Sequence, residues 1–291
     1  MVEVASSTGP CKPAAFREIV LAHYRRHGRD LPWRRTRAPY AIVVSEVMLQ
    51  QTQVSRVLPK YEQFLATFPT VFSLAEATIA DVLSIWQGLG YNRRALALHR
   101  TAGFVAGHQG IFPRTPVNLA RLPGIGPATA AAVCVFAYDM PLPFIETNIR
   151  SAMIHHFFLG QTSVSDSELL PLVEATLDRA DPRRWYYALM DYGAWVKKTY
   201  GNPGRRSRHH AVQSRFAGSH RQLRAMVLRC LLSAQPAALS LRELKALLPD
   251  EVEGAVIRSV AEELVAEGFL RREEDRYRIA ASRMADDPPR R

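Results

Sequence analysis

The chain has 291 residues, of which 47% are hydrophobic and 22% charged, with a formal net charge of +11 at pH 7. This length can hold one large domain and a smaller one, and the charge favours a polyanionic partner. The composition argues against a membrane protein, because no apolar run reaches the ~18 residues of a span. The N-terminus lacks the apolar core of a signal peptide, and the three cysteines are far apart, which argues against a disulfide framework. We therefore expect a cytoplasmic protein.

Residues 13–200 carry helical patterns almost throughout, after a start at 1–12 that we expect to be flexible. Apolar and polar residues alternate there with the period of a helix, and strand patterns are absent. Two of these helical segments end in glycine, a common residue at helix C-termini. We therefore predict an all-α domain over this range.

The stretch "LPGIGPATAAAVCVF" at 122–136 is a tight turn followed by a helix with a small-residue start. Gly124 and Gly126 supply the backbone freedom that a hairpin needs. The small side chains at 128–130 leave the first backbone N–H groups bare, and such a helix start binds anions, commonly phosphate. An ordinary turn between two helices explains the same shape, so the stretch alone leaves both readings open.

The remaining third of the chain changes character twice. Residues 201–220 have little periodicity and read as a basic linker. Between Arg183 and Arg229 there are eleven Arg or Lys residues and one acid, a concentration that favours nucleic acid over a merely solvated basic face. Residues 221–280 predict three helices and a two-stranded hairpin, a winged-helix-like α+β module. We expect residues 281–291 to be a disordered tail.

Two carboxylates stand out as candidates for chemistry. Glu46 lies in "AIVVSEVML", where a carboxylate is costly unless it is paired or neutral, and burial makes a general acid available near pH 7. A position on the one polar stripe of the helix, with Ser45 and Gln50 as neighbours, explains this glutamate equally well. Glu146 precedes a helix and lies about twenty residues after the hairpin, so it either caps that helix or shares the cleft of the hairpin. Two carboxylates facing one cleft are the usual equipment for cleaving a glycosidic bond.

Taken together, several stretches resemble the helix–hairpin–helix base-excision DNA glycosylases, most closely the adenine DNA glycosylases of the MutY type. The resemblance covers roughly residues 13–200, and its motifs occur in family order. They are "LPWR" at 31–34, "SEVMLQQTQV" at 45–54, "FPTV" at 68–71, "WQGLGY" at 86–91, "LPGIGPATAAAV" at 122–133 and "ALMDYGA" at 188–194.

The resemblance implies a two-lobed all-α fold that flips a nucleotide out of duplex DNA. It makes Glu46 the acid that protonates the base, Gln51 a residue inserted into the duplex and Tyr91 a wedge in the opposite strand. The hairpin would clamp a DNA phosphate. The full set of expected DNA-binding or base-binding residues is Arg34, Gln50, Gln51, Tyr91, Gly124, Gly126, Ala128, Thr129, Asn148, Arg205, Arg206 and Arg208.

Three departures from the family pattern bear on function. Glu146 aligns with the catalytic aspartate of the family and is longer by one methylene. The segment after "MDYGA" holds no cysteine, where the family places four ligands of an iron–sulfur cluster. The domain with which such enzymes check for 8-oxoguanine is not apparent.

From these features we expect a monofunctional glycosylase in base excision repair, without lyase activity, that acts on mispaired or damaged double-stranded DNA. Adenine is the first candidate base. The alternatives are another base, such as thymine or uracil opposite guanine, or a lesion-binding protein without catalysis. We expect no iron–sulfur cluster and no metal site, with a monovalent cation at the hairpin left open, and a monomer associated with the nucleoid.

Overall fold

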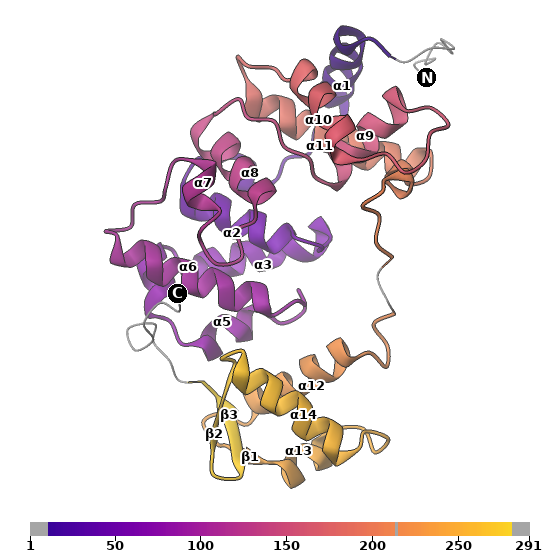
Figure 1. Ribbon diagram of the computed structural model, residues 1–291. Coiled ribbons are helices and arrows are strands. Elements are labelled where there is room, and N and C mark those ends of the chain that lie inside the picture. The colour runs from indigo at the N-terminus through magenta and orange to yellow at the C-terminus, as the bar shows by residue number, and fades with distance from the viewer. Residues whose placement is uncertain (1–10, 213–214, 281–291) are drawn as a thin grey trace. The chain divides into compact units, whose positions relative to one another are not determined.

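The computed structural model describes residues 11–212 and 215–280 (Figure 1). Most of the start expected to be flexible, and the tail at 281–291, lie outside these residues. The described chain forms two compact units that interleave along the sequence. The first unit comprises 11–42, 113–121 and 125–212, and the second comprises 43–112, 122–124 and 215–280. The chain passes from one unit to the other within a single helix, α2 (Pro39–Leu49).

The first unit is a helical bundle around buried aromatic side chains. The ring of Phe16 makes edge contacts with Phe157, Trp185 and Tyr192 at centroid distances of 5.2, 6.2 and 6.3 Å, and all four side chains are buried. Such pairs stabilise a core beyond their buried area. Besides the first residues of α2, this unit contains α1 (Pro13–His27), η1 (Pro32–Arg34), α7 (Pro116–Leu119), α8 (Pro127–Tyr138), α9 (Thr147–Phe157), α10 (Asp166–Thr176), α11 (Pro182–Thr199) and η2 (Pro203–Arg206).

The second unit begins with the end of α2 and continues through four helices. Phe64 and Trp86 form its buried aromatic centre, with ring centroids 6.2 Å apart. Thr70 and Thr78 begin two of the helices with capping boxes, which satisfy the first backbone N–H groups. The helices are α3 (Val54–Thr67), α4 (Val71–Glu76), α5 (Ile79–Trp86) and α6 (Arg93–Gly107).

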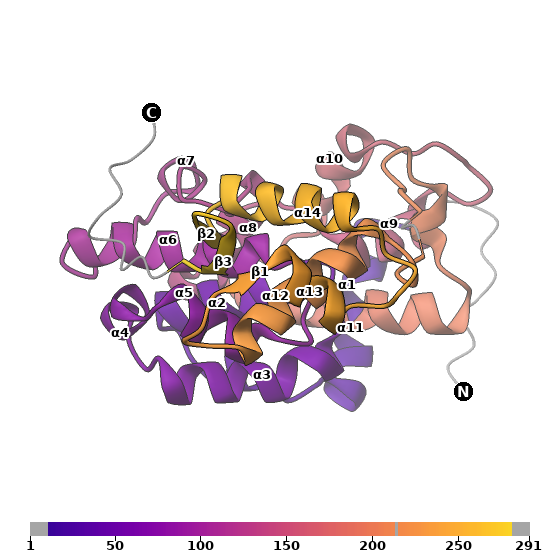
Figure 2. The ribbon, with the colours of Figure 1, turned by 90° about the horizontal axis from the view of Figure 1, so that it is seen from below.

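The C-terminal part of the second unit, residues 215–280, is called the C-terminal module below. Figures 1 and 2 show its helices gathered with a small sheet, whose antiparallel strands have the order β1-β3-β2. Ile257, Val260 and Leu264 on one face of α14 are fully buried in its core. The elements are α12 (His220–Ser233), β1 (Leu239–Ser240), α13 (Leu241–Leu247), α14 (Gly254–Ala266), β2 (Leu270–Glu273) and β3 (Arg276–Ile279).

The predicted fold class is confirmed: the chain is mostly helical, with a small α+β module near its C-terminus. Residues 43–112 form one compact unit with the C-terminal module, and the expected domain boundary at 201–220 stays a prediction. Within the described part of the chain, no helix is both long and apolar enough to cross a membrane.

Candidate functional site

The buried guanidinium of Arg94 ties together two loops of the second unit. Its Nη1 donates to the carbonyl oxygens of Val47 and Met48, both at 2.9 Å, at the end of α2. Its Nη2 donates to Thr52 Oγ1 at 2.9 Å and to the carbonyl oxygen of Gly90 at 3.0 Å. One side chain therefore fixes the end of the Glu46 helix against the loop that carries Tyr91.

Burial lowers the pKa of Arg94 to about 10, which leaves the guanidinium charged at neutral pH. A buried positive charge is costly unless it is hydrogen-bonded, and here the carbonyl oxygens supply those bonds. Arg94 and its hydrogen bonds to the two loops are called the Arg94 clasp below. Sequence reasoning missed it. The available signal was the arginine pair that follows "GLGYN". An arginine at the start of an apolar helix can be buried when its guanidinium donates to the carbonyl oxygens of nearby loops.

The "GLGY" loop has a backbone that only a few residue types adopt readily. Gly88, Gly90 and Tyr91 have φ values of 92°, 74° and 49°. For Tyr91 a positive φ is unusual and marks a backbone held by its surroundings. The guanidinium of Arg94 lies 5.5 Å from the centre of the Tyr91 ring, which is half-exposed. The loop thus presents a fixed aromatic side chain at the surface.

Glu46 lies in the part of α2 that belongs to the second unit. It is half-buried, and its neighbours Val44, Ser45 and Val47 are at most 1% exposed. Between residues 41 and 48, Glu46 is therefore the one residue that is partly exposed. A general acid needs this combination, because its carboxyl group must reach the ligand while the neighbouring side chains are shielded from water.

The turn after α2 holds the two glutamines. Gln51 is exposed and has a φ of 52°, so the turn directs its side chain away from the helix. Gln50 Nε2 donates to the carbonyl oxygen of Gly124 at 3.2 Å, which joins this turn to the hairpin. The structure therefore gives Gln50 a contact within the protein and leaves Gln51 facing outward.

The hairpin requires Gly124 for two reasons. Its φ is 74°, and a Cβ atom on it would lie 2.7 Å from the Cβ of Ala97 on α6. Any other residue would push the hairpin away from that helix.

Gly126 ends the hairpin as the N-cap of α8, and no side chain caps the helix there. Gly126 and Ala128 are exposed, and Thr129 is half-exposed. The helix start is accordingly open to an anion. This chemistry is what the small residues predict.

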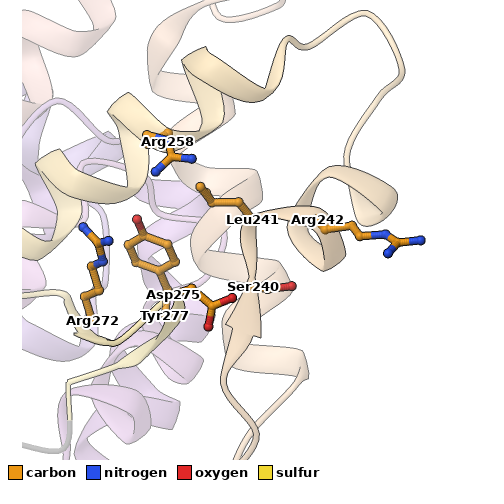
Figure 3. Close-up of a pocket in the computed structure, with 7 residues that line it drawn as sticks. All are labelled: Ser240, Leu241, Arg242, Arg258, Arg272, Asp275 and Tyr277. Atoms are coloured by element: carbon orange, nitrogen blue, oxygen red, sulfur yellow. The ribbon is translucent and has the colours of Figure 1, made fainter.

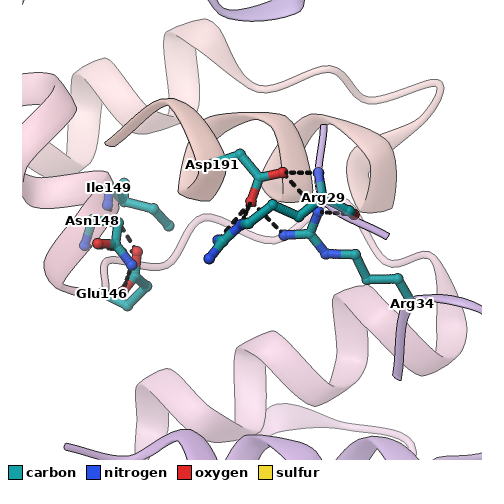
Figure 4. A network of polar contacts seen from close by, with 6 residues as sticks. All are labelled: Arg29, Arg34, Glu146, Asn148, Ile149 and Asp191. Atoms are coloured by element: carbon teal, nitrogen blue, oxygen red, sulfur yellow. Dashed lines mark hydrogen bonds and ion pairs between the residues drawn. The ribbon is translucent and has the colours of Figure 1, made fainter. Parts of the chain in front are cut away.

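Glu146 in the first unit is the N-cap of α9 (Figure 4). Its Oε1 accepts from the backbone N–H groups of Asn148 and Ile149 at 2.8 and 2.9 Å. Its Oε2 accepts from Asn148 Nδ2 at 3.1 Å and Thr147 Oγ1 at 3.2 Å. The capping role that the sequence left open is therefore present, and the helix start interacts favourably with the negative charge.

Lys197 lies near this carboxylate and was not singled out from the sequence. It follows Gly193 by one turn on α11, and a Cβ on Gly193 would lie 2.1 Å from the carbonyl oxygen of Asn148. α11 and α9 therefore touch beside Glu146. Burial lowers the pKa of Lys197, and the carboxylate of Glu146 acts in the opposite direction.

Arg34 is bound inside the first unit rather than exposed (Figure 4). Its Nη1 and Nη2 donate to the two carboxylate oxygens of Asp191 at 2.8 and 2.7 Å, and the two side chains are 7% and 2% exposed. Arg29 donates to the same carboxylate through its backbone N–H and Nε. The donors that the DNA-contact prediction assigned to Arg34 are thus used within the protein, because a buried aspartate needs them.

The basic residues after α11 divide in the same way. Arg206 donates to the carbonyl oxygens of Phe158 at 2.7 Å and Ile154 at 3.2 Å, where a cation suits the C-terminal end of α9. Arg205 and Arg208 are exposed. The structure therefore uses Arg206 internally and leaves the other two available to a partner.

The C-terminal module has a shallow pocket lined by Arg242, Arg258, Arg272 and Asp275 (Figure 3). Arg272 Nη1 and the Tyr277 hydroxyl donate to the carboxylate of Glu262 at 3.0 and 2.6 Å. The ion pair between Arg272 and Glu262 neutralises part of the positive charge that the strands β2 and β3 carry.

The cysteines do not fit a four-thiolate cluster. Cys11 precedes α1, Cys134 is buried in α8 and Cys230 lies in α12. In the described parts of the chain, no three His, Cys, Asp or Glu side chains gather to hold a metal ion.

Comparison with known proteins identifies relatives of this arrangement. Residues 44–171 match the family described as HhH-GPD superfamily base excision DNA repair protein. The adenine DNA glycosylase of Mycobacterium tuberculosis (strain H37Rv) is 34% identical over 243 residues, which cover 74% of this chain and 78% of that protein. The adenine DNA glycosylase of Mycolicibacterium smegmatis is 40% identical over 181 residues, or 61% of each chain.

Other relatives are longer, and the solved structures extend the comparison to the fold. The chain spans about half the length of the adenine DNA glycosylase of Buchnera aphidicola subsp. Acyrthosiphon pisum, which is 31% identical and covered to 53%. A thermostable thymine-DNA glycosylase has a TM-score of 0.56 at 26% identity, covering 62% of this chain and 86% of that one. A complex of endonuclease III with DNA, at 14% identity and a TM-score of 0.52, shares the fold over 62% of this chain and 85% of that one.

Proposed function

Because this chain belongs to the helix–hairpin–helix superfamily of base excision DNA repair proteins, and within it to the MutY-type adenine DNA glycosylases, we propose that it removes adenine from mispaired duplex DNA. The observation that carries this proposal is the Arg94 clasp. It joins the end of the Glu46 helix, the Gln51 turn and the Tyr91 loop within one compact unit. A rigid frame of this kind suits an enzyme that must hold a flipped base against its acid.

The proposed reaction is hydrolysis of the bond between the sugar carbon and the base nitrogen. Glu46 donates a proton to the adenine base, which makes the base a better leaving group. The bond electrons leave with the base, and the sugar develops the positive charge of an oxocarbenium ion. The carboxylate of Glu146 stabilises that charge, the oxygen of a water molecule bonds to the sugar carbon, and the proton that the water loses restores the acid form of Glu46.

DNA binding in this proposal uses the exposed groups. The uncapped start of α8 takes a phosphate, Tyr91 and Gln51 enter the base stack, and Arg205 and Arg208 add phosphate contacts. The substrate is double-stranded DNA with a mismatch or lesion, and the protein acts as a monomer in the cytoplasm. It works without a cluster or lyase step.

Thymine opposite guanine is the second candidate substrate. The similarity to a thymine-DNA glycosylase at 26% identity supports it, as does Glu146 in place of the aspartate expected of the family. The two candidates share the fold and the acid, and they differ in the base that the pocket accepts.

A panel of duplexes separates these candidates. Single-turnover base release is measured on adenine opposite guanine, adenine opposite 8-oxoguanine, thymine opposite guanine and uracil opposite guanine. We expect release of adenine from at least one of the first two. Release confined to thymine or uracil supports the second candidate, and binding without release of any base contradicts a glycosylase.

A further inference from the structure

The C-terminal module contacts the "GLGY" side of the second unit through an acidic helix end. Glu267, just after α14, accepts two hydrogen bonds from Arg93, with Nε to Oε2 at 2.9 Å and Nη2 to Oε1 at 2.5 Å. Arg224 Nη2 donates to the same carboxylate at 2.6 Å, and Arg100 Nη2 donates to the backbone oxygen of Glu267 at 3.2 Å. Glu267 thereby bridges the module to α6.

A second contact engages the candidate wedge itself. Arg221 on α12 donates through Nη1 to the Tyr91 hydroxyl at 3.0 Å, and its guanidinium lies 5.8 Å from the ring centre. Tyr91 and Arg93 are two residues apart, at the start of α6. The module therefore holds the aromatic tip and the neighbouring cation together.

The charges of this contact match those of a nucleic-acid backbone. Arg93 is exposed at the first turn of α6, and a carboxylate on its guanidinium fork takes the geometry that a phosphate would take. Glu263 adds a second carboxylate, paired with Arg224 at 3.0 Å. Two carboxylates at one end of α14 thus pair with arginines whose guanidinium groups could bind phosphates in their place.

The contact is built to open. The side chains of Arg93 and Glu267 are 75% and 20% exposed, and an ion pair with one partner so open to solvent is weakened by water and screened by salt. The polar links at Arg93, Arg100 and Tyr91 lie on the surface of α6 and its leading loop, whereas the core of the module is closed separately around Ile257, Val260 and Leu264. The separate core gives the module a reason to stay folded when these polar links break.

We propose that the acidic end of α14 is an intramolecular competitor of DNA, docked over Tyr91 and Arg93 until a duplex displaces it. The inference rests on the proposed DNA-binding function. Displacement separates Arg93 from Glu267 and Arg221 from Tyr91, so the same movement removes two acids from the DNA surface and leaves these two arginines to face phosphates. Undamaged DNA is then bound weakly, because part of its affinity is spent on opening the module.

The test compares two single substitutions on the full chain. Glu267→Gln removes the bridging carboxylate, and Glu251→Gln removes one exposed charge from the turn before α14. Binding of an undamaged duplex is followed by fluorescence anisotropy at low salt. We expect Glu267→Gln to tighten binding about threefold relative to Glu251→Gln, and the difference to shrink as salt rises. In a chain that already carries Arg93→Gln, the Glu267→Gln effect should be smaller.

A measurement without DNA separates the two proposals. Hydrogen exchange of the segment 88–96 should be faster in Glu267→Gln than in Glu251→Gln, because the docked module covers it. Weaker DNA binding by Glu267→Gln, or affinity and exchange equal to those of Glu251→Gln, would overturn the competitor. If no variant binds DNA while exchange still rises, docking stands, but competition with DNA and the proposed function both fail.

Discussion

The Glu146 carboxylate has a structural task and a proposed chemical one at the same time. It caps α9 through Oε1 and receives the side chains of Thr147 and Asn148 on Oε2. These bonds fix the orientation of a side chain that is longer than an aspartate. The additional methylene is accommodated because the carboxylate folds back onto the helix start.

Substitutions at Glu146 separate the two tasks. Glu146→Gln should lose most base release, because a neutral amide does not stabilise a developing cation. Glu146→Asp should keep part of it, since aspartate is a good cap and restores the residue of the family. Single-turnover rates give the activity, and thermal unfolding gives the cap, worth ~1 kcal/mol. Parental activity in Glu146→Gln would leave this residue as a cap alone.

The buried carboxylate of Asp191 and its arginine partners are expected to contribute to the stability of the first unit. Burial alone would raise the pKa of this carboxyl, but hydrogen bonds and charge from Arg34 and Arg29 outweigh it and keep the pKa below its usual value. Asp191→Asn leaves two cations with reduced compensation and should cost about 3 kcal/mol in the free energy of unfolding. Urea unfolding at pH 7 measures this.

The control is Glu174→Gln, which breaks an ion pair with Arg179 whose side chains are 55% and 61% exposed, and which should cost less than ~1 kcal/mol. The sign of the pH dependence follows from the lowered pKa. The stabilisation from Asp191 is complete above the pKa of an unfolded aspartate and declines as pH falls toward the folded value. Equal effects of the two substitutions at pH 7 would contradict the buried network.

Among the secondary-structure elements, the helical character of the chain could be predicted from the sequence. The partners of several side chains on these helices could not. Periodicity predicted that residues 13–200 are helical almost throughout, and the hairpin before α8 follows from its glycines. Strand β1 was missed, because two residues show no alternation and pair only through β3. Arg34 and Arg206 were expected on DNA, yet buried partners far along the chain use their donors. Long-range pairing of this kind leaves no local signal.

The start of α8 determines whether the enzyme can form a covalent intermediate. A lyase of this fold needs an amine at the hairpin to form a Schiff base, and that position is Ala128. We expect borohydride to trap no covalent complex with DNA that carries an abasic site. Lys197 is the amine to test as an alternative nucleophile, because it lies near the carboxylate of Glu146. A trapped complex that disappears in Lys197→Met would contradict a purely hydrolytic enzyme.

At the scale of the whole molecule, we expect the fold to form without an iron–sulfur cluster, because the segment after α11 holds no cysteine. The segment there binds α9 through Arg206 and through Asn202 Oδ1, which accepts from Ser151 Oγ at 3.2 Å. We expect the purified protein to be colourless and to contain no stoichiometric iron, because three dispersed cysteines cannot supply four ligands. Iron analysis and the visible spectrum check this, and a bound cluster would overturn it.

The central claim is that Glu46 is the acid of a DNA glycosylase. The most direct measurement is single-turnover release of adenine from a mismatched duplex by the parent chain and by Glu46→Gln, with duplex affinity measured in parallel. We expect the substitution to lower base release by at least about 10²-fold, the contribution of general acid catalysis, while affinity stays within about twofold because the DNA contacts are untouched. Base release at the parental rate in Glu46→Gln would rule out Glu46 as the acid.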